Sequence, residues 1–256
     1  MLPLVGPIFY RYSYDAARRD GVISPFELWN YKIALTSKER AEYEETSKRI
    51  AVVFAKIRAE YRKLGKPAPS VRDLVIGDRD NASNALRRLL LARRSVSINA
   101  KMRIPAAAKI AMQFGSAPTL VFHERITQAN ILRDLLEEMG ARCTIYHSQI
   151  SPIRRSLNLL MFRQGLKGML VTCRALDEGL DVPEAEAGVI AASTRSLRQR
   201  IQRMGRILRS AEGKSAATVC TIYATDEEEN DLREEASRLR DIAQVRWFSV
   251  GRDLEA

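Results

Sequence analysis

The chain has 256 residues, 46% of them hydrophobic and 29% charged, a composition typical of a folded globular protein rather than a disordered one. It has no apolar run of the roughly 20 residues that span a bilayer. Its start, MLPLVGPIFYRYS, lacks the basic region and cleavage site of a secretion signal. Three scattered cysteines and two histidines form neither a zinc-ligand pattern nor a disulfide framework. We expect a cytoplasmic protein with no membrane partner and no bound metal of its own.

The net charge of +11 is unevenly distributed. Residues 1–100 contain 19 Lys and Arg against 11 Asp and Glu, a net charge of +8, whereas residues 101–256 contain 23 against 20. Such a surplus favours a polyanionic partner, most simply nucleic acid. A soluble basic surface without a partner is the alternative, and charge alone does not decide between the two.

The first hundred residues are predicted to be mainly helical. Thr36 and Glu39 form a capping-box pattern, and the apolar residues that follow recur at helical spacing up to Gly65. The predicted elements are one extended segment followed by three helices, at 7–14, 36–64, 81–94 and 101–113. We predict that residues 1–100 form a connector and a basic helical appendage.

From Pro118 onward, short apolar runs alternate with amphipathic helices. Strands are predicted at 119–122, 143–147, 169–173, 188–192 and 217–223, with helices between them. This alternation predicts an α/β fold, a parallel sheet covered by helices on both faces. We assign this second domain to residues 101–245 and a C-terminal tail to residues 246–256.

The segment QRMGRILR, residues 202–209, places several polar side chains on one face of a predicted helix. At about 100° per residue, Gln202, Arg206 and Arg209 fall within roughly 60° of one another. Guanidinium groups are permanently ionised donors whose geometry matches phosphate oxygens. The cluster therefore favours a polyphosphate ligand, and the alternative is a solvated basic helix face.

The segment LVTCRALDEGLDVPEAEAGVI, residues 170–190, is the second candidate site. Its predicted strand brings Thr172 to the carboxyl edge of the sheet, where open α/β sheets usually bind ligands. The Thr172 hydroxyl could donate to a phosphate, and the Asp181 carboxylate could accept a hydrogen bond from a sugar hydroxyl. The alternative is a tight loop in which Asp181 is only a turn residue.

Four segments, in order, resemble the second motor domain of superfamily 2 helicases, most closely the XPB-like and related DEAD/DEAH-type DNA helicases. TLVFHER resembles motif IV, YHSQISPIRRSLNLLMFRQG the segment that follows it, LVTCRALDEGLDVP motif V, and QRMGRILR the Q-R-x-G-R-x-x-R form of motif VI. The resemblance covers about residues 117–225. It extends more weakly to GPIFYRYSYDAARRDGVISPFEL, which is similar to the connector after motif III. The fold that it implies is RecA-like.

The resemblance also implies roles for the basic cluster. Arg206 and Arg209 would be arginine fingers that reach the γ-phosphate of ATP and neutralise charge developing during phosphoryl transfer. Gln202 would orient the phosphate or the attacking water. Arg203 would support the motif rather than act as a finger.

Further roles are implied at the ends of the predicted strands. Gly179 and Asp181 would lie at the ribose side of the nucleotide, and Thr172 would contact the nucleic-acid backbone. His123 could face nucleic acid, and it could equally be a polar residue at a strand end. His147 is interpreted as structural.

The sequence lacks the other half of such a motor. No G-x-x-x-x-G-K-[ST] phosphate-binding loop and no D-E-A-D or D-E-x-H motif occurs. Gly213, Lys214 and Ser215 are interpreted as a turn before a strand. DEEEN, residues 226–230, is interpreted as an acidic helix start, which is favourable for the helix dipole. We expect ATP and Mg²⁺ to be held mainly by a P-loop domain absent from this chain.

The sequence therefore predicts the C-terminal motor half of an ATP-dependent DNA helicase or translocase. Its expected partners are DNA, with RNA possible, and a first motor domain in cis or in trans. A truncated piece or a split gene is the expected origin, and the isolated chain is expected to be inactive. The alternative is a non-catalytic nucleic-acid-binding or scaffolding protein with this fold. The presence of both finger arginines argues against it, because a scaffold does not need them.

Overall fold

The computed structural model describes residues 16, 19–20, 25–67, 69–76, 81–173, 182, 185–192, 216–240 and 243–251. The extended segment predicted at 7–14 and the helix predicted to hold residues 202–209 lie outside the described residues. In the part of the chain that is described, no helix has the length and apolar character needed to cross a bilayer.

The chain divides into two compact units. One comprises residues 1–33 and 104–256 and contains the sheet, and the other comprises residues 34–103 and is helical. The helical unit is thus inserted in the sequence after the first described strand, β1 (Phe26–Lys32). Residues 1–100 were predicted to form a connector and a basic helical appendage, and in the structure β1 belongs to the sheet unit.

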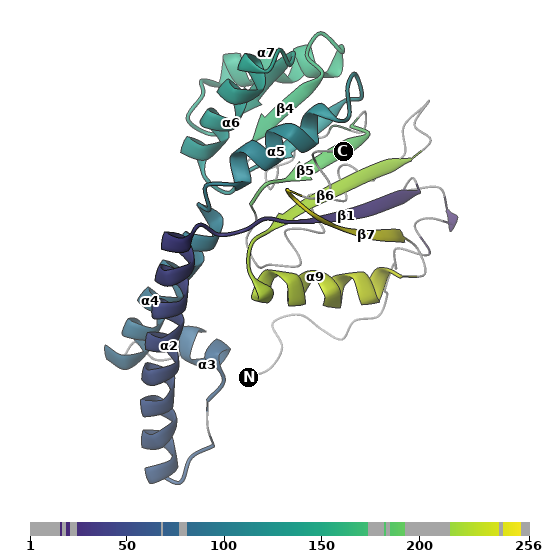
Figure 1. Cartoon of the computed structure of the whole chain (residues 1–256). Helices are drawn as coiled ribbons and strands as arrows, with labels where there is room; N and C mark the ends of the chain where they lie inside the picture. The colour runs from purple at the N-terminus through teal and green to yellow at the C-terminus, as the bar shows by residue number, and fades with distance from the viewer. Residues whose placement is uncertain are drawn as a thin grey trace. The chain divides into compact units, whose positions relative to one another are not determined.

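In the described part of the chain, seven parallel strands form a single sheet in the order β3-β4-β2-β5-β6-β1-β7 (Figure 1). The strands after β1 are β2 (Thr119–Phe122), β3 (Cys143–Tyr146), β4 (Met169–Thr172), β5 (Ala187–Ile190), β6 (Ala217–Tyr223) and β7 (Ala243–Ser249). Every residue of the neighbouring strands β4, β2 and β5 is buried. Parallel strands buried on both sides require cover on both faces of the sheet.

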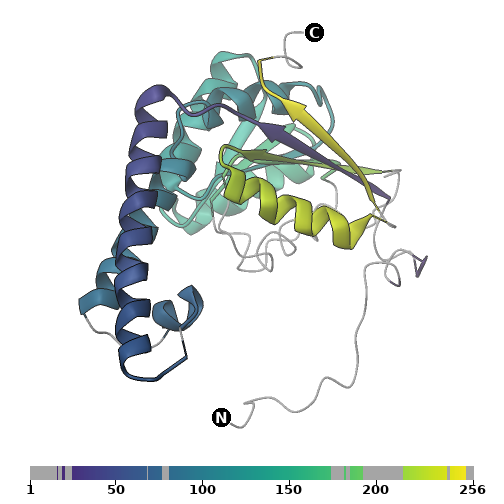
Figure 2. The same cartoon turned by 60° about the horizontal axis from the view of Figure 1, so that its bottom comes forward.

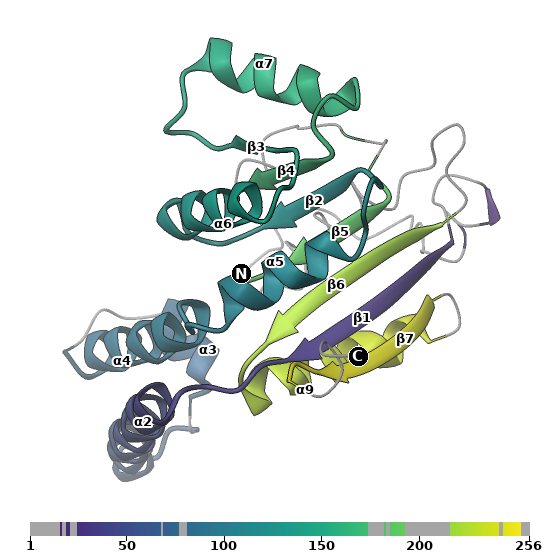
Figure 3. The ribbon, with the colours of Figure 1, turned by 45° about the horizontal axis from the view of Figure 1, so that its top comes forward.

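Helices supply that cover. In the described part of the sheet unit, the helices are α5 (Arg103–Met112), α6 (Ile126–Glu138), α7 (Pro152–Arg163) and α9 (Asp226–Leu239). The crossover from β2 to β3 and the crossover from β3 to β4 run in opposite directions across the sheet. Because such crossovers are right-handed, α6 and α7 cover opposite faces, and Figure 3 shows β3 and β4 between them. The RecA-like α/β fold predicted from the sequence is confirmed.

The core of the sheet unit is aliphatic and aromatic. It forms one buried cluster of strand and helix residues: Phe26, Leu28, Leu120, Phe122, Phe162, Leu170, Val182, Ala185, Ile190, Ala217, Val219 and Leu239. Each fully buried large apolar side chain in such a cluster stabilises the fold by about 1.5–3 kcal/mol. Strand β1 supplies two of these residues, so it is part of the core rather than of a connector.

Two strands at one end of the sheet were missed by the sequence-based prediction. Strand β1 pairs in parallel with both β6 and β7, and β7 occupies residues that were predicted to belong to the second domain's end and the C-terminal tail. In β7, exposed and half-buried residues alternate because it is the edge strand. Its Arg246 Nε lies 3.3 Å from Glu27 Oε2 on β1, an ion pair across the ladder. A half-polar edge strand such as β7 gives only a weak hydrophobic pattern, which explains why β7 was missed.

The inserted unit consists of α2 (Ser37–Lys63), α3 (Val71–Ile76) and α4 (Asn81–Ile98). The predicted capping box is present: the Glu39 N–H donates to Thr36 Oγ1 at 3.3 Å, and the Thr36 N–H donates to Glu39 Oε2 at 2.9 Å. Helices α2 and α4 lie side by side (Figures 1 and 2). A small core built around Ile57, Leu74 and Leu86 joins all three helices. Residues 34–103 hold 17 Lys and Arg against 8 Asp and Glu, so this unit has a net charge of +9.

Candidate functional site

The carboxyl ends of the central strands meet at one edge of the sheet. Phe122, the last residue of β2, lies opposite Thr172 on β4 and opposite Ile190 on β5. The backbone pairing continues beyond β2, because the His123 N–H donates to Thr172 O at 3.1 Å. The structure thus brings together Thr172 and His123, the two residues expected to face nucleic acid.

A strand-end polar cluster surrounds this contact. It is formed by His123, Glu124, Thr172 and Cys173, each no more than 5% exposed. The Arg125 N–H donates to His123 Nδ1 at 3.1 Å, and the Cys173 thiol donates to Glu124 O at 3.1 Å. Because Nδ1 accepts this hydrogen bond, that nitrogen carries no proton. These contacts fix the backbone of the two strand ends against each other.

The Thr172 hydroxyl is the distinctive group of this cluster. The residue is 0% exposed, and among the described residues no hydrogen-bond partner is found for Oγ1. A buried hydroxyl without a partner costs about 1–3 kcal/mol. Such a group calls for an explanation, and a ligand atom that completes its hydrogen bond is one.

Sequence reasoning missed Glu124 and Cys173 as members of this site. Each directly follows a residue that it had singled out, and the thiol–carbonyl contact joins segments 49 residues apart. Their positions directly after predicted parallel strands could have indicated them, since parallel strands end at the same edge of a sheet.

All three cysteines are buried. Burial raises the pKa of Cys143 to about 11 and raises the pKa of Cys220 as well, so both thiols stay protonated near neutral pH.

His147, interpreted from the sequence as structural, lies just after β3. Its Nε2 is 3.1 Å from Asn130 Oδ1 on α6, and the Gln149 N–H donates to its Nδ1 at 3.3 Å. Burial lowers the pKa of His147, as do the nearby charges of Arg133 and Arg155. The ring is therefore neutral at physiological pH and joins the end of β3 to α6.

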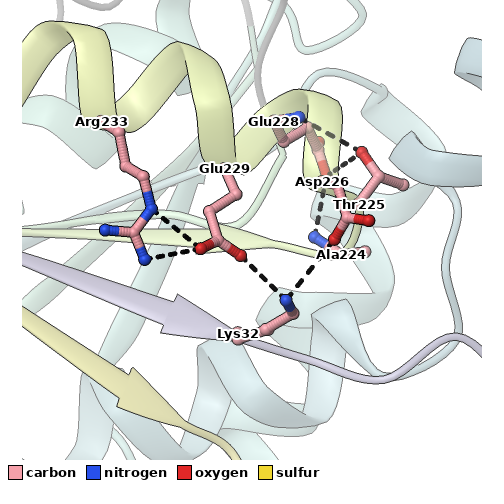
Figure 4. A network of polar contacts seen from close by, with 7 residues as sticks. All are labelled: Lys32, Ala224, Thr225, Asp226, Glu228, Glu229 and Arg233. Carbon is pink, nitrogen blue, oxygen red and sulfur yellow. Dashed lines mark hydrogen bonds and ion pairs between the residues drawn. The ribbon is translucent and has the colours of Figure 1, made fainter.

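A second polar group lies where β1 ends (Figure 4). Lys32 Nζ donates to Glu229 Oε2 at 2.8 Å and lies 3.6 Å from Asp226 Oδ1, both on α9. Arg233 donates to the other Glu229 oxygen from Nε at 2.9 Å and from its terminal nitrogen at 2.7 Å. The hydrogen bond to Glu229 raises the pKa of Lys32, and the same bond lowers the pKa of Glu229. This network holds α9 against the end of β1.

The start of α9 confirms that DEEEN is an acidic helix start. The Glu228 N–H donates to Thr225 Oγ1 at 3.3 Å, and the Ala224 N–H donates to Glu228 Oε2 at 2.8 Å. The first bond satisfies a backbone N–H that the first helical turn leaves without a partner, and the second ties the residue before the cap to the helix. Among the described residues, no group of three or more His, Cys, Asp or Glu side chains is suited to hold a metal ion.

The remaining predicted site residues lie outside the described part of the chain. They are Gly179 and Asp181 in the motif V-like segment and Gln202, Arg206 and Arg209 in the motif VI-like segment. Their roles stay predictions. The structure describes β4, which contains Thr172 and forms the start of the motif V-like segment, and its neighbour β2.

Comparison with known proteins identifies the sheet unit. Residues 106–211 match the family of the helicase conserved C-terminal domain. The chain is 30% identical over 132 residues to DEAD-box ATP-dependent RNA helicase 22 of Oryza sativa subsp. japonica, a match covering 52% of this chain and 22% of that protein. It is 24% identical over 213 residues to DNA 3'-5' translocase XPB2 of Sulfurisphaera tokodaii, covering 82% of this chain and 46% of that protein. The chain thus spans less than half of either relative.

A solved structure supports the fold. The C-terminal domain of the DEAD-box protein Dbp5 superposes with a TM-score of 0.50 at 18% identity, over 57% of this chain and 83% of that one. The similarity at this identity concerns the fold alone. The chain thus contains a domain of this fold whose residues 106–211 match the helicase conserved C-terminal domain family.

Proposed function

We propose that the chain is the C-terminal motor half of an ATP-dependent DNA helicase or translocase. It would act with a P-loop first motor domain, in cis or in trans. One observation carries the proposal: the match to the helicase C-terminal family runs to residue 211 and so includes Gln202, Arg206 and Arg209. The polyphosphate-binding cluster inferred from helical spacing thus lies within the matched region.

ATP bound by the first motor domain with Mg²⁺ supplies the phosphoryl group and the energy of hydrolysis. In this proposal, Arg206 and Arg209 approach the γ-phosphate and stabilise the charge that develops there. Gln202 orients the phosphate or the attacking water, and Gly179 and Asp181 contact the ribose side of the nucleotide. These residues complete a site whose phosphate-binding loop another domain provides.

Two features of the described residues support nucleic acid as the partner. The buried Thr172 hydroxyl has no partner in the described part of the chain, and a phosphate oxygen would be a suitable acceptor. The inserted unit, residues 34–103, has a net charge of +9, which attracts a polyanion over a long range at low salt. His123 would either position Thr172 through their backbone hydrogen bond or contact the nucleic-acid strand directly.

DNA is proposed over RNA because of the extent of one similarity. The DNA translocase of Sulfurisphaera tokodaii is matched over 82% of this chain, so that match covers parts of the chain beyond the core domain. The rice RNA helicase is matched over 52%. A relative that shares more of the chain is the better guide to what the whole chain binds.

The proposal is tested by complementation. A P-loop domain encoded upstream or beside this chain is purified alone, mixed with the chain, and fused to it. ATP turnover is measured with double-stranded DNA, single-stranded DNA, RNA or no nucleic acid. We expect turnover only when both halves are present, with stronger stimulation by DNA than by RNA. Full turnover by the P-loop domain alone would favour the scaffolding alternative, and stronger stimulation by RNA would overturn the choice of DNA.

A further inference from the structure

Helix α7 presents an apolar stripe to solvent. Ile153 is 85% exposed, Leu157 is 52% exposed and Leu160 is 49% exposed, and Leu166, just after the helix, is 56% exposed. At about 100° per residue, the three helical members fall within roughly 60° of one another. We call Ile153, Leu157, Leu160 and Leu166 the α7 stripe. Aliphatic side chains that are exposed one by one need no explanation, but three on one helix face, with a fourth just beyond the helix end, do.

The opposite face of α7 already has its packing partners, so the α7 stripe is a second apolar face and not a displaced core face. Phe162 is 2% exposed and belongs to the central core cluster, and Leu159 packs against that cluster. Asn158 Nδ2 donates to Ile145 O on β3 at 2.7 Å, and the Arg155 guanidinium lies over the Tyr146 ring. Rotating the helix to bury the stripe would break all of these contacts. Figure 3 shows α7 over β3 and β4 at that end of the sheet.

Cations flank the stripe. Arg154 and Arg163 are both exposed and project about 80–100° to either side of it. Between Glu138 and Asp177 the sequence contains six Lys and Arg and no Asp or Glu. The local surface is therefore a row of aliphatic side chains between positive charges.

We propose that the α7 stripe is a docking site for an acidic amphipathic helix of a partner protein. Such a helix places aliphatic residues at positions i, i+3, i+4 and i+7 against the stripe, the spacing with which helices recognise apolar surfaces. Its flanking Asp and Glu side chains then meet Arg154 and Arg163, which fixes the orientation and favours acidic partners over basic ones. The site is a recruitment surface and uses none of the residues proposed for nucleotide or nucleic-acid contact.

Other occupants fit the stripe less well. Single-stranded nucleic acid stacks its bases on aromatic side chains, and the stripe has none. A helix that lies on a membrane has many Lys and Arg beside Trp, Phe or Leu, whereas only two cations flank this stripe. A second copy of the chain would bring the same cations face to face, because no acidic residue lies on α7.

The test uses the full chain and fluorescently labelled helical peptides about four turns long. One peptide carries leucines at i, i+3, i+4 and i+7 flanked by glutamates, and a matched peptide has lysines in place of the glutamates. Binding is measured by fluorescence anisotropy for wild type, Leu157→Gln, and Arg154→Glu combined with Arg163→Glu. The matched control is Ile131→Gln, a 50% exposed aliphatic residue on α6. Circular dichroism checks that each variant is folded.

We expect the acidic peptide to bind wild type and the Ile131→Gln variant equally. Leu157→Gln should weaken binding by about tenfold or more, and the double arginine variant should remove the preference for the acidic peptide. No binding of the acidic peptide, or equal binding of both peptides to wild type, would overturn the proposal. Binding to phosphatidylserine-containing vesicles that Leu157→Gln abolishes, without peptide binding, would assign the stripe to membranes instead. Self-association abolished by Leu157→Gln would assign it to a second copy.

Discussion

The His123 N–H donates to Thr172 O at 3.1 Å, which joins the end of β2 to the end of β4. These two residues lie within the segments that resemble helicase motifs IV and V. The bond fixes the relative position of the two strand ends at the same sheet edge. A ligand that contacts both strand ends would therefore meet a prearranged pair of backbones, which lowers the entropy cost of binding.

Thr172→Val should weaken nucleic-acid binding without destabilising the chain. Valine keeps the β-branched shape that suits a buried strand and removes only the hydroxyl. Because Oγ1 has no partner among the described residues, its loss removes a desolvated polar group, and the free energy of unfolding should stay equal or rise by up to about 1 kcal/mol. Urea unfolding and fluorescence anisotropy with a labelled DNA measure the two effects separately.

Thr172→Ser is the matched control for that change. It keeps the hydroxyl and removes a methyl group, so it should lower stability by about 1 kcal/mol and bind DNA better than the valine variant. A valine variant that binds DNA as wild type does would show that the Thr172 hydroxyl contributes nothing to nucleic-acid recognition.

DNA binding by the chain should be sensitive to salt and insensitive to sequence. The proposed contacts are made to phosphates, and neutralising each phosphate lowers the slope of log K against log salt by about 0.9 for duplex DNA. The inserted unit, residues 34–103, supplies most of the positive charge. Anisotropy titrations at several salt concentrations with two unrelated duplexes check both points. Binding that persists at high salt, or that prefers one duplex strongly, would contradict this account.

The Lys32–Glu229 pair should stabilise the fold in a pH-dependent way. The pKa of Glu229 is lowered in the folded state, so its contribution is present above the unfolded value of about 4.3 and is lost as the pH falls through the folded pKa. The pKa of Lys32 is raised, so its contribution is present below its ordinary value and is lost only in strongly alkaline solution. Lys32 is partly exposed, so Lys32→Met should cost only about 1 kcal/mol or less at pH 7.

Urea unfolding of wild type and Lys32→Met at pH 7 and at pH 3 measures that prediction. The difference between the two proteins should be largest at pH 7 and shrink toward pH 3, as the falling pH protonates Glu229. If the free energies of unfolding of wild type and Lys32→Met differ by the same amount at both pH values, Lys32 acts through its aliphatic packing and not through the ion pair.

Much of the sheet unit could be predicted because its signals are local. Buried parallel strands such as β2 and β4 are continuous apolar runs, and Thr36 with Glu39 marks a helix start within four residues. Strand β1 was missed because it precedes the helical insertion and pairs with β6, almost 200 residues later in the sequence. Nothing local in FELWNYK specifies that partner.

The candidate site was predictable to a similar degree. The position of Thr172 at a strand end followed from the strand pattern, and its backbone contact with His123 depends on the strand order, which periodicity does not give. The Lys32–Glu229 pair is a long-range contact of the same kind. The α7 stripe was visible in the sequence as Ile153, Leu157 and Leu160. That it faces solvent became known only once Phe162 was placed in the core.

The isolated chain should hydrolyse ATP no faster than a blank. It contains no phosphate-binding loop of the G-x-x-x-x-G-K-[ST] type, and such a loop provides most of the contacts to the β-phosphate. Nucleotide affinity should be weak and rest on Asp181 and the arginines. Robust magnesium-dependent turnover that survives Arg206→Ala would contradict the assignment of the missing site to another domain.

The most direct test of the central claim is ATP turnover by the two-domain protein with Arg206 or Arg209 replaced. Arg→Ala at either position should leave the domain folded and lower kcat by on the order of 10³-fold, because a finger arginine acts on charge that develops in the transition state. Arg→Lys should restore activity only in part, since lysine keeps the charge but lacks the planar fork. Nucleotide Kd should change less than kcat. Normal turnover in the alanine variants, with DNA binding lost, would show that the cluster is a nucleic-acid face and that these arginines are not fingers.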